Sequence, residues 1–330
     1  MAVLAADAAS FLGAFDANQA RPFYLDFPLS SRVAIEAAAR LAAAAAGREL
    51  SEPCGREPAD AEIGDRSFAW RLTGTPGLIV KVLATSEHST LRSWLAAETT
   101  SSALKQTPGI RAPRVKLHAS APVPWALEDE AVGAPATTLS LNHLRAFEVV
   151  LSIQQTSLRQ TVALDLYDHR RFRRNIHLPL EELAQASVIS RTAQAEAWQL
   201  ANCHLQRMRD FDPVLAHNDL AIHHIYLGDD EPWVIDWERP VRDRSMMLDV
   251  AHLMVNHGSL DIAWANRLGA TACSYMPDPE QAHSNLVVAL LERVAGKALD
   301  ALRRQRRQAL DAVQALSAIL AGELVSTVGE

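Results

Sequence analysis

The chain has 330 residues, of which 48% are hydrophobic and 22% are charged, and its formal net charge at pH 7 is −7. This composition is that of an ordinary globular protein and excludes a largely disordered chain, while the length allows two packed domains or one large one. The negative charge argues against a generic nucleic-acid binder, because such proteins need a basic face to displace counterions.

The first clear pattern is an alanine-rich helix over residues 31–48, which a serine precedes and a glycine ends. Glu36 and Arg40 interrupt its apolar residues, and the segment is shorter than the roughly 20 apolar residues that span a bilayer. The residues before it include no basic region typical of a signal peptide. We therefore expect neither a membrane span nor a secretion signal.

Strand patterns begin at residue 67. The short β-type runs SFAWRL and LIVKVL are separated by TGTPG, whose glycines and proline predict a hairpin turn. Helical spacing follows over residues 90–105, and two further strand-like runs, APRVKLHA and PWALED, come after it. The order strand, strand, helix, strand, strand is typical of a small nucleotide-binding lobe.

The rest of the chain reads as almost wholly helical, with predicted helical segments over residues 139–160, 179–209 and 283–322. One short β-rich segment at 214–237 interrupts them, and within it a tight turn joins the runs HHIYL and WVIDW. A hairpin with acidic and histidine side chains at its ends, set in a helical region, indicates a site. We predict an α+β fold with a nucleotide-binding lobe over 1–132 and a mainly helical lobe over 133–330.

Two aspartates at the ends of this hairpin suit phosphoryl transfer, which needs a carboxylate that orients the attacking hydroxyl and metal ions that bridge the phosphates. Asp219, in the sequence HND, stands where a kinase catalytic loop holds that carboxylate. Asp236 follows the apolar run WVI, and a carboxylate at the end of a buried strand is costly unless it meets a cation such as Mg²⁺.

A cation for the phosphates is found upstream. Lys81 lies inside the apolar run LIVKVL and therefore needs an anionic partner. Glu98, on the following predicted helix, is well placed to position it, so that Lys81 touches the α and β phosphates.

Several motifs in order resemble the aminoglycoside phosphotransferase and choline kinase superfamily. That family's pattern runs H-x-D-x-x-x-x-N, then I-D-W/F, then D-L-A/V, and this chain has VLAHNDLAIHHIYL, PWVIDWERP and MMLDVAHL. LIVKVL, the glutamate of LAAETTSSAL, RAPRV and PWALEDEAVGAP match upstream, so the resemblance covers roughly residues 60–255. It implies a protein-kinase-like bilobal fold with an antiparallel β lobe, one key helix and a helical C-terminal lobe.

The resemblance also implies roles for individual residues. Asp219 would be the catalytic base, Asp236 the metal ligand, and Asp249 the family's later structural aspartate.

For the nucleotide, the resemblance implies ATP with Lys81 as the phosphate lysine, paired with Glu98. The backbone from Leu127 through Asp129 to about residue 132 would hold the adenine. The only candidate for the phosphate-covering loop is the glycine-poor GDRS segment that ends at Ser67.

His224 stands where the family has asparagine, five residues after the catalytic aspartate. Asparagine offers Mg²⁺ a hard oxygen, whereas imidazole nitrogen suits softer metals. His224 could therefore ligate a metal such as Mn²⁺, donate to a phosphate, or have no catalytic use. A histidine here also resembles the lipopolysaccharide core heptose kinases.

The leading hypothesis is an ATP-dependent phosphotransferase that moves the γ-phosphate to a hydroxyl of a small molecule such as an aminoglycoside, a sugar or an amino alcohol. A lipopolysaccharide-core sugar kinase is the alternative within this class, and a nucleotide-binding pseudokinase is the alternative outside it. Three cysteines, far apart and in no paired spacing, predict a reducing compartment, the cytoplasm. The sequence leaves the acceptor, the oligomeric state and the choice between ATP and GTP open.

Overall fold

The computed structural model describes residues 32–54, 67–83, 88–105, 107–119, 123–155, 172–208, 214–237, 240–255, 261–303 and 308–324. The chain forms two compact units. The first unit comprises Met1–Leu95 and Val115–Glu130, and the second comprises Ala96–Arg114 and Ala131–Glu330. The predicted lobe boundary at residue 132 stays a prediction.

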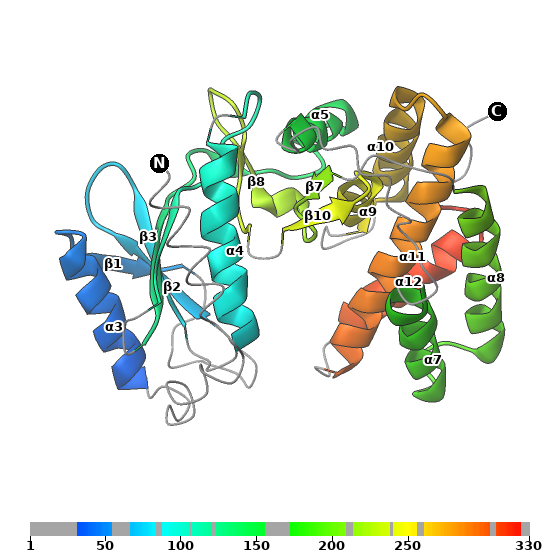
Figure 1. Cartoon of the computed structure of the whole chain (residues 1–330), viewed down its shortest axis with the longest axis horizontal. Coiled ribbons are helices and arrows are strands. Elements are labelled where there is room, and N and C mark those ends of the chain that lie inside the picture. Colours follow the sequence, from blue (N-terminus) through cyan, green and yellow to red (C-terminus); the bar gives the residue numbers. More distant parts are fainter. Residues whose placement is uncertain are drawn as a thin grey trace. The chain divides into compact units, whose positions relative to one another are not determined.

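The first unit is built on one antiparallel sheet of five strands in the order β1-β2-β3-β5-β4. Figure 1 labels the first three of these strands. Its strands are β1 (Leu50–Pro53), β2 (Ser67–Leu72), β3 (Leu78–Leu83), β4 (Val115–His118) and β5 (Trp125–Asp129). The predicted small antiparallel β lobe is confirmed.

A helix packs on each face of this sheet. On one face, α3 (Arg32–Ala45) buries alanines such as Ala39 against Val80 and Val82 of β3. On the other face, Trp94 of α4 (His88–Leu104) packs against Leu83. Because successive strand residues point to opposite faces, Lys81 shares the α4 face with Leu83. The helices predicted over 31–48 and 90–105 are confirmed.

The second unit contains two small sheets. In one, β6 (Ala134–Pro135) and β9 (Trp233–Val234) flank β8 (Ile225–Leu227); in the other, β7 (Val214–Ala216) pairs with β10 (Val241–Arg244). Ile225 pairs with Val234 and Tyr226 with Trp233, so the predicted hairpin is confirmed. Its first strand begins later than predicted, because residues 222–224 form a single 3₁₀ turn.

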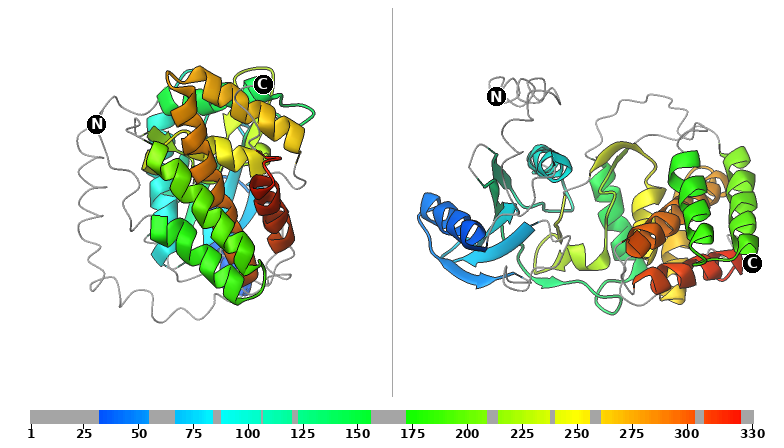
Figure 2. Two further views of the ribbon diagram at one scale, coloured as in Figure 1. Left: turned by 90° about the vertical axis from the view of Figure 1, so that its right-hand side faces the viewer. Right: turned by 90° about the horizontal axis from the view of Figure 1, so that it is seen from below.

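Helices make up the rest of the second unit, around the long helix α11 (Figures 1 and 2). Helix α11 packs against α7, α8, α9, α10 and α12, and its apolar residues Leu290, Leu291 and Val294 are buried. The helices are α5 (His143–Gln155), α7 (Leu178–Gln185), α8 (Arg191–Arg207), α9 (Met247–Val255), α10 (Ile262–Tyr275), α11 (Pro279–Arg303) and α12 (Gln308–Leu320), with a π-helical turn at Arg173–His177 before α7.

One predicted helix is wrong. The pattern over 179–209 predicted a single helix, but the chain forms α7 and α8 with a break between them. Ser187 has a left-handed φ of 58°, and the Ser190 side chain caps α8 by accepting a hydrogen bond from the backbone N–H of Ala193 at 3.0 Å. Serine hydroxyls compete with the helix for backbone groups, so these residues favour a helix end over its interior.

In the described part of the chain, no helix is both long and apolar enough to cross a membrane.

Candidate active site

The candidate catalytic loop follows β7, and a buried aspartate holds its backbone. Asp249, near the start of α9, accepts a hydrogen bond from the backbone N–H of His217 at 2.8 Å and from that of Asn218 at 2.9 Å. Asn218 has a φ of 63°, a conformation that asparagine tolerates better than most residues. With two N–H groups fixed, the loop presents Asp219 in a defined place. This is the structural role that the resemblance implied for Asp249.

Asp249 has a perturbed acidity. The residue is 1% exposed, and this burial raises the pKa of its carboxyl group from 3.8 to about 7. The two backbone hydrogen bonds favour the carboxylate and oppose the rise, whereas the charge of Asp219 adds to it.

His217 joins the candidate catalytic loop to the segment that carries the second aspartate. Its imidazole is fully buried, and Nε2 lies 2.8 Å from the carbonyl oxygen of Ile235. Because a carbonyl only accepts, this contact requires the proton on Nε2. Burial lowers the pKa of His217, so the ring is favoured in its neutral form. The ring also packs against Trp237, at a centroid distance of 4.5 Å.

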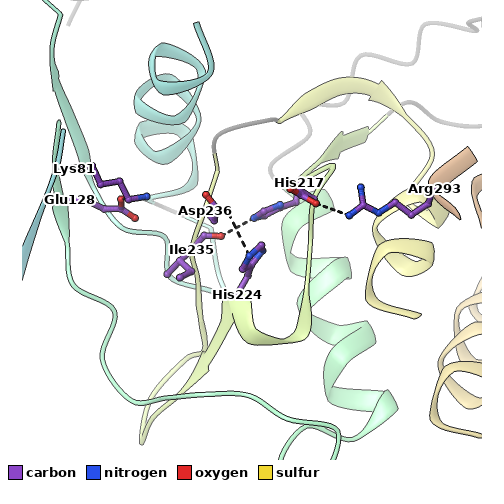
Figure 3. Close-up of polar contacts among 8 residues, drawn as sticks. Lys81, Glu128, His217, His224, Ile235, Asp236 and Arg293 are labelled. Atoms are coloured by element: carbon purple, nitrogen blue, oxygen red, sulfur yellow. Dashed lines mark hydrogen bonds and ion pairs between the residues drawn. The ribbon is translucent and has the colours of Figure 1, made fainter. Parts of the chain in front are cut away.

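Asp236 follows directly after Ile235, just beyond β9. It has a φ of 66°, a left-handed conformation that costs a non-glycine residue about 1–3 kcal/mol and that recurs at functional sites. The His217 contact to the preceding carbonyl fixes this turn. Asp249 therefore holds the backbone before Asp219, and His217 holds the backbone before Asp236 through the carbonyl oxygen of Ile235 (Figure 3).

His224 faces Asp236, with 3.5 Å between His224 Nε2 and Asp236 Oδ2 (Figure 3). Burial lowers the pKa of His224, while the negative charge of Asp236 opposes this. A neutral imidazole and a carboxylate this close can share one divalent ion, because metal–ligand distances are about 2.0–2.2 Å. Among the described residues, no three or more His, Cys, Asp or Glu side chains form a metal site. The pair could hold a divalent ion, whose remaining ligands would be phosphates and water.

The structure adds one residue that the sequence did not indicate. Arg293, on α11, forms an ion pair with Asp219, with 2.8 Å between Nη2 and Oδ1 (Figure 3). The two side chains are only 20% and 31% exposed. The one signal in the sequence is the charged pair Glu292 and Arg293 within the apolar run LVVALLERVAG, which does not indicate that the partner of Arg293 lies 74 residues earlier.

Lys81 has a carboxylate partner that sequence reasoning also missed. Its Nζ lies 2.8 Å from Oε2 of Glu128, whose side chain is 8% exposed (Figure 3). Lys81 stands opposite Ala126 in the ladder between β3 and β5, so Glu128, two residues along, is on the same face and within diagonal reach. The pairing of Lys81 with Glu98, which lies on α4, stays a prediction.

The other predicted nucleotide residues lie on the same sheet of the first unit. Ser67 begins β2 opposite Leu83, whereas Leu127 and Asp129 lie on β5 opposite residues 80 and 78 of β3. The glycine-poor segment 64–66 before Ser67 lies outside the described residues. The roles of Ser67, Leu127 and Asp129 stay predictions.

Comparison with known proteins identifies the fold. No protein-family model and no curated protein matches the chain. Among solved structures, an apo thermostable mutant of aminoglycoside phosphotransferase APH(4)-Ia is 16% identical with a TM-score of 0.60, and the match covers 86% of this chain and 97% of that one. The same mutant protein with N202A, in a ternary complex with AMP-PNP and hygromycin B, is 17% identical with a TM-score of 0.60, covering 86% and 96%.

A second enzyme with the same fold also matches. The GDP and kanamycin complex of APH(2")-IIia is 12% identical with a TM-score of 0.61, and the match covers 87% of this chain and 99% of that one. The resemblance of the loop histidine to heptose kinases stays a prediction. The chain thus has the protein-kinase-like fold of the aminoglycoside phosphotransferases, as its ordered motifs implied.

Proposed function

We propose that the protein is an ATP-dependent phosphotransferase that moves the γ-phosphate to a hydroxyl group of a small molecule. The observation that carries this proposal is that hydrogen bonds fix the backbone before each of two carboxylates, Asp219 and Asp236. Asp249 holds the backbone before Asp219, and His217 bonds to the carbonyl before Asp236. Phosphoryl transfer relies on positioning and on charge stabilisation, and a rigid pair of carboxylates supplies both.

Within this proposal, Asp219 is the base that orients the acceptor hydroxyl and receives its proton as the phosphorus–oxygen bond forms. Asp236 and His224 would hold Mg²⁺, or Mn²⁺, which neutralises charge on the transferring phosphate when it is bound. A neutral His224 is the form that can act as a ligand, and its burial favours that form.

For the nucleotide, we propose that Lys81 contacts the α and β phosphates and that Glu98 helps to position it. The ion pair between Lys81 and Glu128 supports this use, because it fixes the ammonium group on one face of the sheet. The backbone around Leu127 and Asp129 would hold the adenine, and Ser67 would cover the phosphates.

The acceptor class is proposed from the neighbours. The two matched enzymes are bound to hygromycin B and to kanamycin, which suggests an aminoglycoside or a similar polyhydroxylated molecule as the acceptor. Because His224 replaces the family's asparagine and resembles the histidine of the heptose kinases, a lipopolysaccharide-core sugar should also be tested as an acceptor. The same histidine favours the second candidate function, a nucleotide-binding pseudokinase that binds ATP without turnover. We place the activity in the cytoplasm, which agrees with the free thiols of all three cysteines.

The test is a single isosteric substitution. Asp219→Asn should lose nearly all turnover in a screen of hydroxyl acceptors while its affinity for ATP, measured by thermal shift, stays close to that of the wild type. The control is Asp229→Asn, on the exposed turn between β8 and β9, which should leave turnover unchanged. An Asp219→Asn enzyme that keeps most of its kcat would overturn the assigned base. ATP binding by the wild type without turnover on any acceptor would favour the pseudokinase.

A further inference from the structure

Helices α9 and α11 of the second unit each contact a different part of the catalytic loop. Helix α9 supplies Asp249, which holds the loop through the backbone N–H groups of His217 and Asn218. Helix α11 supplies Arg293, which contacts the side chain of Asp219. Helix α9 therefore fixes the path of the loop, and α11 contacts the carboxylate that the loop carries.

The contact of Arg293 is made at one oxygen of the carboxylate. Nη2 donates to Oδ1 of Asp219 at 2.8 Å. Among the described residues, the other oxygen, Oδ2, makes no hydrogen bond. A carboxylate free to rotate offers either oxygen in many directions, whereas one held at Oδ1 presents Oδ2 in one direction.

Helix α11 is a rigid base for this contact. Leu290, Leu291 and Val294, around Arg293, are buried in the helical core. One turn further along, Lys297 donates a hydrogen bond from Nζ to the carbonyl oxygen of Val255 at 3.0 Å, which ties α11 to the end of α9. The guanidinium group therefore projects from an anchored helix and is not a mobile surface side chain.

The partial burial of Arg293 and Asp219 strengthens their interaction. Exposed ion pairs contribute little, because water screens their attraction and holding them costs side-chain entropy. Arg293 and Asp219 are 20% and 31% exposed, so their interaction is less screened. A charge-assisted hydrogen bond of this kind is roughly twice as strong as a neutral one.

We propose that Arg293 is a positioning residue of the phosphotransfer reaction, which holds Asp219 Oδ1 so that Oδ2 is presented to the acceptor hydroxyl. This inference rests on the proposed function, in which Asp219 is the base. Arg293 acts through Asp219 and need not touch the acceptor or the nucleotide.

The central experiment is a set of steady-state measurements on Arg293→Ala and Arg293→Lys with an acceptor identified in the screen. Arg293→Ala should lower kcat on the order of 10²-fold, as expected for misplacement of a catalytic group, with the KM for ATP nearly unchanged. Arg293→Lys should recover part of the loss. Guanidinium ion, added well below denaturing concentrations, should partly restore kcat of Arg293→Ala, whereas urea, which has a similar shape and no charge, should not.

Two controls separate positioning from a structural effect. Arg191→Ala removes an exposed arginine that donates a hydrogen bond to Gln194 Oε1 at 3.0 Å, and it should keep wild-type kcat and show no response to guanidinium. The double variant Arg293→Ala with Asp219→Asn should be no slower than Asp219→Asn alone, because Arg293 acts only through that side chain. A purely structural role predicts additive losses and no rescue by guanidinium.

The results distinguish the two proposals. Normal kcat in Arg293→Ala, or a raised KM for the acceptor with unchanged kcat, overturns the positioning role while the proposed function stands. Absence of rescue together with additive losses in the double variant also overturns it. A wild-type enzyme without turnover on any acceptor overturns the proposed function and, with it, this inference.

Discussion

Replacement of Asp249 should uncouple the candidate catalytic loop from α9. In Asp249→Leu, the buried N–H groups of His217 and Asn218 lose their acceptor. Each unsatisfied buried donor costs about 1–3 kcal/mol, so the free energy of unfolding should fall by about 2–6 kcal/mol. The loss is smaller than this sum because the variant no longer has the desolvation cost of a buried carboxyl group. Because native proteins are stable by only about 5–15 kcal/mol, this variant should be severely destabilised.

Asp249→Asn gives a sharper test through its pH dependence. The pKa of Asp249 is about 7 in the folded protein, against 3.8 for a free side chain, so the folded state binds this proton more tightly than the unfolded state does. The protonated Asp249 side chain therefore stabilises the folded state below about pH 4, and this stabilisation is lost as the pH rises to about 7. The loss of free energy of unfolding over that range amounts to about 4 kcal/mol. Asparagine has no proton to lose. The wild type should therefore lose stability relative to Asp249→Asn as the pH rises.

The assay is urea unfolding of both proteins from about pH 4 to about pH 8, combined with amide exchange at His217 and Asn218. Asp249→Asn keeps one acceptor oxygen, so one of the two amides should lose protection and the other should keep it. The control is Asp261→Asn, at the N-cap of α10, which should leave stability nearly unchanged because asparagine caps a helix as well as aspartate. A stability difference between wild type and Asp249→Asn that is constant with pH would refute the reasoning.

Three further sets of substitutions test other parts of the structure. Gly133→Ala should lower the melting temperature, because the φ of Gly133 is +109° and the added Cβ would lie 2.1 Å from a carbonyl oxygen of β8. The control Gly296→Ala, whose added Cβ would have no atom within 4 Å, should raise the free energy of unfolding by up to about 1 kcal/mol. Equal melting temperatures of the two variants would contradict this prediction. Lys81→Met should weaken ATP binding and destabilise the protein by leaving Glu128 without its ammonium partner, and adding Glu128→Gln should recover stability but not ATP binding. His224→Asn should shift the metal preference of activity from Mn²⁺ towards Mg²⁺, and an unchanged preference would exclude His224 as a ligand.

The local sequence determined much of the fold and part of the candidate site. The short apolar run LIVKVL placed Lys81 on a strand, and the turn between two short runs predicted the hairpin with Asp236 at its end. These features depend on neighbours within a few residues, because side-chain period and turn chemistry are local properties of the chain. The ordered motifs added the fold, which the solved structures confirm.

Contacts between distant segments were decided only by the tertiary structure. Glu128 reaches Lys81 because of the register between β3 and β5, and register is set by the whole sheet. Arg293 reaches Asp219 because α11 packs beside α9, although the two residues are 74 positions apart. The sequence shows which residues carry charge, whereas helix packing and strand register decide which charges meet, because both arise from burial summed over many distant residues.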